Sequence, residues 1–201
     1  VYEAGFSGYN LYRSLEKKGI ACQIVNPASL HSSSNERVKT DKNDAKKLAT
    51  QFSKGLLRGI CIPSEKRQLL REVSRMREQI SRTRARIIVQ IKMKLHFFGL
   101  SDKDDNRKMS NKFLKQIESR DLPEELKLSF TMLADQWRLL TKQLYELRKK
   151  VIHILDSMPR RRDILLSVPG VSYISASILL FELGNIEDRF QNERELFSYT
   201  G

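Results

Sequence analysis

Three carboxylates near the start of the chain have the types and spacing expected of a divalent-metal site. Asp41 and Asp44 lie three residues apart in the segment KTDKNDA, and Glu3 lies in the strand-like segment VYEA. Carboxylate oxygens suit Mg²⁺, and two such ions about 4 Å apart can activate a nucleophile and stabilise a leaving oxygen in phosphodiester cleavage. We therefore predict that these three acids are catalytic residues that bind Mg²⁺ or Mn²⁺.

The helix predicted to begin at Asp41 supports this interpretation. At about 100° per residue, both aspartates fall on the same side of the helix as Leu48 and Phe52. They are then expected to face the sheet rather than solvent, where two carboxylates repel each other unless a cation lies between them. The alternative is that both are ordinary helix-start acids, which complement the helix dipole and cap free N–H groups.

Residues 1–62 are predicted to form an α/β domain that positions these acids. The strand-like segments VYEA, IACQIV and LRGICIP alternate with two helices, the second over residues 41–54. Such alternation indicates crossover connections and a mainly parallel sheet. No fourth acid in residues 1–62 fits the site, so a further strand and acid are expected ahead of Val1. Cys22 and Cys61 are expected to be buried free thiols in a reducing compartment.

Residues 63–158 are predicted to form a long antiparallel coiled coil. The second of its two helices alternates apolar spacings of four and three over four heptads, which is typical of a coiled-coil seam. The coiled coil is also expected to pair subunits, most simply as a dimer. The predicted seam positions are Leu69, Val73, Met76, Ile80, Ile87, Ile91 and Leu95, followed by Leu126, Phe130, Leu133, Trp137, Leu140, Leu144, Leu147, Val151 and Ile154.

The charge balance favours a polyanionic partner. The 201 residues carry 37 Lys and Arg against 24 Asp and Glu, a net charge of +13, and each phosphate that a protein neutralises releases condensed counterions. No apolar run approaches the roughly 18 residues of a membrane span, so no membrane partner is expected. The arginines of the first long helix form either a phosphate-facing surface or a solvated flank of the coiled coil. The candidates for nucleic-acid binding in this helix are Arg71, Arg75, Arg82 and Arg86.

Residues 159–201 are predicted to form a small all-α region similar to a helix-hairpin-helix. Its VPGV turn contains Gly170, while Ser172 replaces the second glycine that lets backbone N–H groups approach a phosphate. The upstream residues Arg160, Arg161 and Arg162 would supply positive charge. The alternative is an αα-hairpin whose turn only packs two helices.

The segments EAG, VNP and KTDKNDA resemble the DEDD-type insertion-sequence transposases. The segments LLSVPGVSYISASILLFELGN and RFQNERELFSYTG are similar to the opening of the second, serine-bearing domain of that family. The resemblance implies an RNase H-like, RuvC-like catalytic domain over residues 1–62, then a coiled coil, then part of the second domain from residue 159. In the acidic tetrad of the family, Glu3, Asp41 and Asp44 match the second, third and fourth acids.

The resemblance also implies a function. A transposase of this family cuts and rejoins DNA with the acidic metal site and a serine nucleophile, and it uses a structured guide RNA encoded by its own element in the bacterial cytoplasm. The first acid and the serine are expected outside residues 1–201, so the chain alone is expected to be inactive. Two alternatives remain, a non-catalytic nucleic-acid-binding coiled-coil adaptor and a metal-dependent, structure-specific nuclease that uses the acids without a serine.

Overall fold

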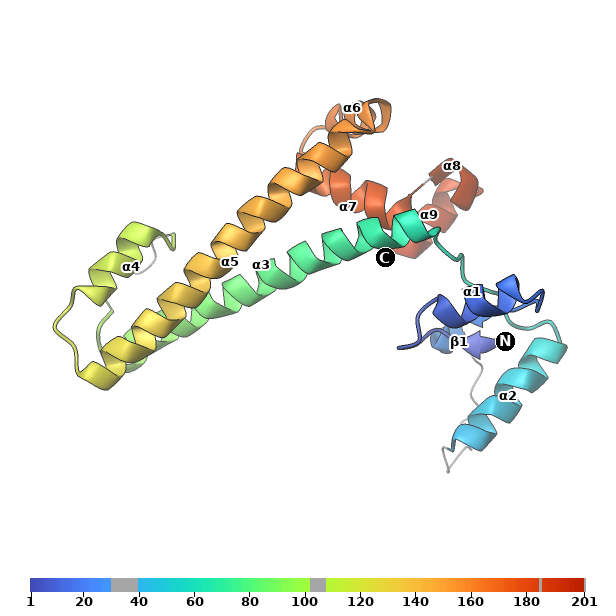
Figure 1. Ribbon diagram of the computed structural model, residues 1–201, viewed down its shortest axis with the longest axis horizontal. Coiled ribbons are helices and arrows are strands. Elements are labelled where there is room, and N and C mark those ends of the chain that lie inside the picture. The colour runs from blue at the N-terminus through green and yellow to red at the C-terminus, as the bar shows by residue number, and fades with distance from the viewer. Residues whose placement is uncertain (30–39, 102–107, 185, 201) are drawn as a thin grey trace. The chain divides into compact units, whose positions relative to one another are not determined.

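A computed structural model describes residues 1–29, 40–101, 108–184 and 186–200. The chain divides into two compact units, residues 1–63 and residues 64–201, and each is described by itself (Figure 1). The segments HSSSNERVK and SDKDDNRK have the polar composition of loops, and most of their residues lie outside the described ones. None of the described helices is both long and apolar enough to cross a membrane.

The first unit is a small α/β unit. Strands β1 and β2 pair in parallel with Tyr2 opposite Ile24, and helix α1 lies in the connection between them. The hydroxyl of Tyr2 donates to the carbonyl of Gly8 at 3.1 Å and accepts from the N–H of Tyr12 at 3.2 Å, which ties the start of α1 to β1. Its elements are β1 (Tyr2–Glu3), α1 (Asn10–Lys17), β2 (Ile24–Val25), the 3₁₀ helix η1 (Pro27–Ser29) and α2 (Asp41–Ser53).

The sheet differs from the prediction in its third segment, because LRGICIP forms no strand. Gly59 makes a single antiparallel bridge to Val25, and the N–H of Ile60 donates to the carbonyl of Ile24 at 2.7 Å. A Cβ atom at Gly59 would lie 2.6 Å from the side chain of Gln23, so a larger residue here would require that side chain to move. Among the described residues, the predicted mainly parallel sheet is one parallel pair with an antiparallel contact at its edge.

The two cysteines lie in the same unit and are both free thiols. Cys22 is half-buried, whereas Cys61 is exposed. The prediction of two buried thiols is therefore wrong for Cys61, because the segment that carries it makes only one bridge to the sheet and leaves this side chain uncovered.

The second unit is helical and is organised by two helices of 33 residues, α3 and α5. Ser64 begins α3, since its hydroxyl accepts from the N–H of Arg67 at 3.3 Å, and Ser110 begins α4 in the same way through Phe113. Its elements are α3 (Glu65–Phe97), α4 (Asn111–Glu118), α5 (Glu124–Asp156), α6 (Pro159–Leu166), α7 (Tyr173–Leu183), α8 (Ile186–Arg189) and α9 (Glu193–Thr200).

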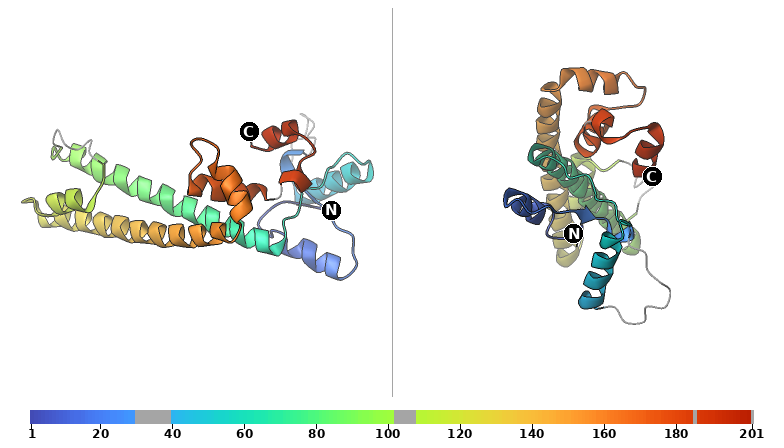
Figure 2. Two further views of the ribbon diagram at one scale, coloured as in Figure 1. Left: turned by 90° about the horizontal axis from the view of Figure 1, so that it is seen from above. Right: turned by 90° about the vertical axis from the view of Figure 1, so that its right-hand side faces the viewer.

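Helices α3 and α5 lie side by side and run antiparallel (Figures 1 and 2). The C-terminal part of α3, the N-terminal part of α5 and helix α4 share a first apolar cluster. A second apolar cluster joins the opposite ends of the same two helices with α7. The first cluster contains Ile87, Ile91, Leu95, Met109, Phe113, Leu114, Ile117, Phe130, Ala134 and Trp137, and the second is built on Val151, Leu155 and Phe181, with Leu70 and Val73 packed against them.

The predicted seam of α5 faces this interior, since each of its nine positions is buried or half-buried. The prediction for α3 is wrong at two positions, because Leu69 and Met76 are 69% and 41% exposed. Arg71 and Ser74 are buried instead. The buried stripe is rotated here because α3 packs against α7 as well as α5.

The region around the N-terminal end of α3 therefore differs from a two-helix coiled coil. Figure 1 shows α5 diverging from α3 toward its own C-terminal end, and Phe181 of α7 packs with Val151 and Leu155 of α5. Three helices share this core. Residues 159–201, expected as a separate small region, belong to the same packed unit as the two long helices.

Candidate functional site

The two aspartates occupy the first turn of α2. The hydroxyl of Thr40 accepts from the N–H of Asn43 at 3.3 Å and fixes the start of the helix just before Asp41. Asp44 is half-buried and Asp41 is exposed. The segment thus has the capping geometry of an ordinary helix start, with acids that complement the positive end of the helix dipole.

The buried side of α2 is rotated from the predicted one. It runs through Asp44, Leu48 and Gln51, whereas Phe52 is 44% exposed. At about 100° per residue, Asp44 lies near the centre of this side and Asp41 lies at its edge. The expectation that both carboxylates share the inward face is therefore wrong for Asp41 and right for Asp44.

Glu3 is half-buried at the end of β1, opposite Val25. Its carboxylate and those of Asp41 and Asp44 are the oxygen donors that a hard cation prefers. However, in the part of the chain that the structure describes, no three His, Cys, Asp or Glu side chains are grouped so that they could hold a metal ion. The structure does not bring these three acids together, and the described residues do not form a complete metal site.

The most elaborate polar arrangement lies at the C-terminal end of α7, where sequence analysis placed no site. Three arginines of α3, together with Arg189, surround Glu182 and the last carbonyls of α7. Arg67 and Arg71 donate to the carbonyl of Glu182 at 2.6 Å and 2.8 Å, and Arg67 also donates to that of Leu183. Arg189 reaches the same two carbonyls at 3.2 Å and 3.3 Å. Positive charge at this end of a helix complements its dipole.

The carboxylate of Glu182 completes this arginine clamp, which consists of Arg67, Arg71, Arg75, Arg189 and Glu182. It accepts two hydrogen bonds from Arg75, at 3.0 Å and 3.1 Å, and lies 3.3 Å from Nε of Arg71. A signal for the clamp was present in the sequence, because positions 67, 71 and 75 repeat every four residues and so share one helix face. Its target could not be found, because Glu182 is more than 100 residues away.

The clamp changes the interpretation of two predicted nucleic-acid-binding residues. The side chain of Arg71 is only 9% exposed and its hydrogen bonds are used inside the protein, so it is not on a surface that a phosphate can approach. Arg75 is 63% exposed but already holds the carboxylate of Glu182. The predicted basic surface of α3 therefore does not include Arg71.

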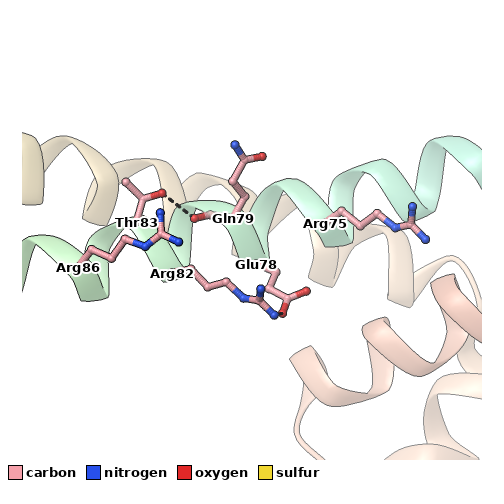
Figure 3. A pocket seen from close by; sticks show the side chains of 6 residues that line it. All are labelled: Arg75, Glu78, Gln79, Arg82, Thr83 and Arg86. Carbon is pink, nitrogen blue, oxygen red and sulfur yellow. Dashed lines mark hydrogen bonds and ion pairs between the residues drawn. The ribbon is translucent and has the colours of Figure 1, made fainter. Parts of the chain in front are cut away.

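Arg82 and Arg86 remain on the outer face of α3, where they line a shallow pocket with Arg75 and Thr83 (Figure 3). Arg82 pairs with Glu78 one turn away at 2.5 Å, and both side chains are largely exposed. An exposed pair of this kind is held weakly, so its arginine stays available to another anion. This face therefore presents exposed positive charge to solvent.

The three consecutive arginines of α6 differ in their surroundings. Arg160 and Arg161 are exposed. Arg162 lies 2.6 Å from Asp156 and 2.8 Å from Asp163, and hydrogen bonds to Asp163 and then to Asp156 raise its pKa. Arg162 thus joins α6 to the end of α5, and the charge that faces solvent here comes from Arg160 and Arg161.

The Pro-Gly turn between α6 and α7 has the geometry of a type II turn. Val171 donates its N–H to the carbonyl of Val168 at 3.1 Å, Pro169 occupies the second position, and Gly170 has φ +85°. Ser172 then caps α7, because its hydroxyl accepts from the N–H of Ser175 at 3.2 Å. Both predicted residues, Gly170 and Ser172, have roles in reversing the chain and starting the next helix.

Comparison with known proteins finds transposases that are similar to this chain. A family model for the DEDD transposases of IS110 elements, described as "Transposase", matches residues 1–99, and one described as "Transposase IS116/IS110/IS902 family" matches residues 162–201. The transposase for insertion sequence element IS1533 of Leptospira borgpetersenii is 30% identical over 99% of this chain and 59% of its own length. Both matched segments are therefore similar to insertion-sequence transposases of the IS110 type. The resemblance stated from the sequence is thereby confirmed.

Other relatives lie in the same group. The protein y4rJ of Sinorhizobium fredii is 26% identical over 100% of this chain and 56% of its own length. The transposase for insertion sequence element IS1328 of Yersinia enterocolitica is 26% identical over 82% of the chain. The chain spans less than two thirds of the length of these relatives. No solved structure gave a significant match.

The two transposase matches fall on segments that pack together. The first ends at Gly99, just after α3, and the second begins within α6 and includes α7. The arginine clamp links α3 to α7. In this chain, a side chain from the first matched segment and one from the second therefore meet in one largely buried ion pair.

Proposed function

We propose that this chain is part of an insertion-sequence transposase that cuts and rejoins DNA, with Glu3, Asp41 and Asp44 as ligands of Mg²⁺ or Mn²⁺. The observation that carries the proposal is the match of both ends of the chain to transposase family models. A serine nucleophile and a further acid would come from sequence beyond the part of the relatives that the chain spans. The acids alone, as described, do not complete the site.

The three acids differ in how far they are buried, and therefore in how each would hold a bound ion. A bound divalent ion would lower the pKa of attacking groups and stabilise a leaving oxygen. Asp44 and Glu3 are half-buried, so their carboxylates would be held in fixed positions by the surrounding unit. Asp41 is exposed at the first position of α2 and would join the site from its open side.

The proposed partners are DNA and a structured guide RNA. The net charge of +13 supports a polyanionic partner, and exposed arginines supply contact points on two helices. On α3 these are Arg82 and Arg86, with Arg75 at the edge of the clamp, and on α6 they are Arg160 and Arg161. Contacts of this type position a nucleic acid without reading its sequence.

The proposed homo-oligomer would use a different face of α5 from the predicted seam. That seam is occupied by α3 of the same chain. Three apolar side chains of α5 point elsewhere, because Leu128, Met132 and Leu139 are 61%, 59% and 56% exposed. Sedimentation over a range of concentrations tests this part of the proposal, and a single monomer mass at all concentrations would refute it.

Strand exchange by the full-length protein tests the catalytic role. The double variant Asp41→Asn with Asp44→Asn should abolish exchange in Mg²⁺ while leaving DNA binding in place. The matched control is Glu124→Gln with Glu125→Gln, which removes two exposed first-turn acids from α5 and should keep exchange close to that of the wild-type protein. Full exchange by the Asp41 and Asp44 variant would exclude the proposed site.

A non-catalytic nucleic-acid-binding adaptor is the second candidate function. The observation that favours it is the exposure of Asp41 together with the lack of a grouped metal site among the described residues. In that case both double variants would behave alike, and Mg²⁺ or Mn²⁺ would leave the thermal stability of the protein unchanged.

A further inference from the structure

Between its two apolar clusters, the α3–α5 pair carries three arginines beside the half-buried Ile80, Leu144 and Leu147. On one side, Ile87 packs in the cluster that contains Trp137, and on the other Val73 packs against Val151. These two pairs set the register of the antiparallel helices: a residue that lies n positions before Ile87 in α3 lies near the residue n positions after Trp137 in α5. Arg84 therefore falls opposite Thr141, and Arg77 falls opposite Arg148. We call Arg77, Arg84 and Arg148 the central arginine cluster.

The cluster lacks the acceptors that other covered arginines have. Arg71 has Glu182, Arg138 has Glu118 at 2.9 Å, and Arg162 has Asp156. Within the described part of the chain, Nε of Arg84 has no hydrogen-bond partner, and both Arg77 and Arg84 are half-buried. The nearby acids are engaged elsewhere, with Glu78 on Arg82 and Glu146 on Lys149.

Two buried polar atoms at this position are unsatisfied. Nε of Arg84 and Oγ1 of Thr141 are shielded from solvent and have no hydrogen-bond partner among the described residues. Leaving buried donors unpaired costs roughly 1–3 kcal/mol each, and more for charged groups. A bound anion that accepts hydrogen bonds from these groups would remove that cost.

The charges of the cluster also oppose one another. Burial, followed by the charges of Arg148 and Arg84, lowers the pKa of Arg77. The same electrostatic cost would be relieved by an anion placed between these guanidinium groups. Because Arg148 is exposed while the other two are half-buried, an anion can reach the cluster from the surface along α5.

We propose that the central arginine cluster, with the hydroxyl of Thr141, binds a backbone phosphate of a nucleic acid. The inference rests on the proposed function, because it takes nucleic acid as the partner. A phosphate offers several acceptor oxygens, and guanidinium groups donate to it in pairs.

The cluster faces α5, whereas Arg75, Arg82 and Arg86 lie on the outer face of α3. Positions 75 and 77 are about 200° apart around this helix. The phosphate site is therefore separate from the outer pocket of Figure 3.

Binding of a 20-base-pair DNA duplex by the 201-residue chain, measured by fluorescence anisotropy over a salt series, tests the proposal. Arg77→Gln with Arg148→Gln should weaken binding and reduce the salt slope by roughly 0.9 for each phosphate that is no longer neutralised. The matched control is Lys142→Gln with Lys150→Gln, which removes two exposed charges from α5. It should change the slope much less. An RNA duplex of the same length shows which nucleic acid supplies the phosphate.

A second measurement separates a phosphate site from general electrostatics. Inorganic phosphate should raise the melting temperature of the wild-type chain above its value in chloride of equal ionic strength, and the Arg77 and Arg148 variant should lose this rise. Arg148→Gln alone serves if the double variant does not fold, because Arg148 is exposed.

The outcomes distinguish this inference from the proposed function. If the wild-type chain binds both duplexes but the cluster variant matches the lysine control in both measurements, the cluster is not a phosphate site. If the wild-type chain binds neither duplex, nucleic-acid binding itself fails. If the cluster variant is more stable than the wild-type chain and binds nucleic acid equally well, the three arginines only repel one another and bind no phosphate. That result also overturns the proposal.

Discussion

The guanidinium of Arg71 lies 3.3 Å from the carboxylate of Glu182 and forms a largely buried ion pair between α3 and α7. The two side chains are 9% and 24% exposed. They come from segments matched by different transposase family models, so the pair fixes the start of the second segment against the long helix that ends the first. The integrity of the second unit should depend on it.

Removing the carboxylate of the clamp should destabilise the chain. Glu182→Ala removes the carboxylate that pairs with both Arg71 and Arg75. The charge of Arg71 then stays buried without its ion-pair partner. Breaking a fully buried pair costs roughly 3–5 kcal/mol. Since Glu182 is partly exposed, we expect about 2 kcal/mol from urea unfolding. The control is Glu78→Ala, which removes an exposed partner of Arg82 and should cost less than about 0.5 kcal/mol. Equal effects would show that the clamp adds no more than a surface pair.

Gly184 should not tolerate a side chain. It has φ +72°, and a Cβ atom there would overlap the guanidinium of Arg67. Gly184→Ala should therefore destabilise the chain by more than the roughly 1–2 kcal/mol of left-handed backbone strain. Gly99→Ala is the matched control, because Gly99 has φ +65° but open space around it. Thermal unfolding compares the two. If both variants lose the same stability, Arg67 moves aside freely and the clamp is loose.

The first apolar cluster should carry much of the stability of the α3–α5 pair. Phe130 is 2% exposed in this cluster, so Phe130→Ala should cost about 3–4 kcal/mol through reduced burial and a cavity. Leu139 lies on the exposed face of α5 that we propose for the oligomer. In dilute protein, where the subunits are separate, Leu139→Ala should change the free energy of unfolding by less than about 0.5 kcal/mol. A large loss at Leu139 would mean that this face is covered, which denaturation at several protein concentrations would reveal.

The long helices could be predicted from the sequence because their apolar spacing depends only on the 3.6-residue repeat. The nine positions predicted for the seam of α5 all turn inward. The side chain of Arg71 could not be placed in the same way. Its burial depends on α7, which follows more than 100 residues later, and composition predicted a solvent-facing arginine.

In the first unit, local sequence was also insufficient to predict which side of α2 is buried and whether LRGICIP forms a strand. KTDKNDA correctly predicted a helix start, and the structure shows that Thr40 caps it. The inward direction of α2, however, is set by its neighbours and passes through Asp44 and Gln51. The segment LRGICIP is rich in strand-forming residues, yet it makes a single bridge, between Gly59 and Val25, because strand pairing depends on the neighbouring strand as well as on residue type.

The central claim is that Glu3, Asp41 and Asp44 hold a divalent ion in the complete protein. Calorimetric titration of the full-length protein with Mn²⁺ tests it most directly, with Glu124→Gln and Glu125→Gln as the control pair. Asp41→Asn with Asp44→Asn should lose Mn²⁺ binding, while the control variant binds as the wild-type protein does. Undiminished Mn²⁺ binding by the Asp41 and Asp44 variant would contradict the claim.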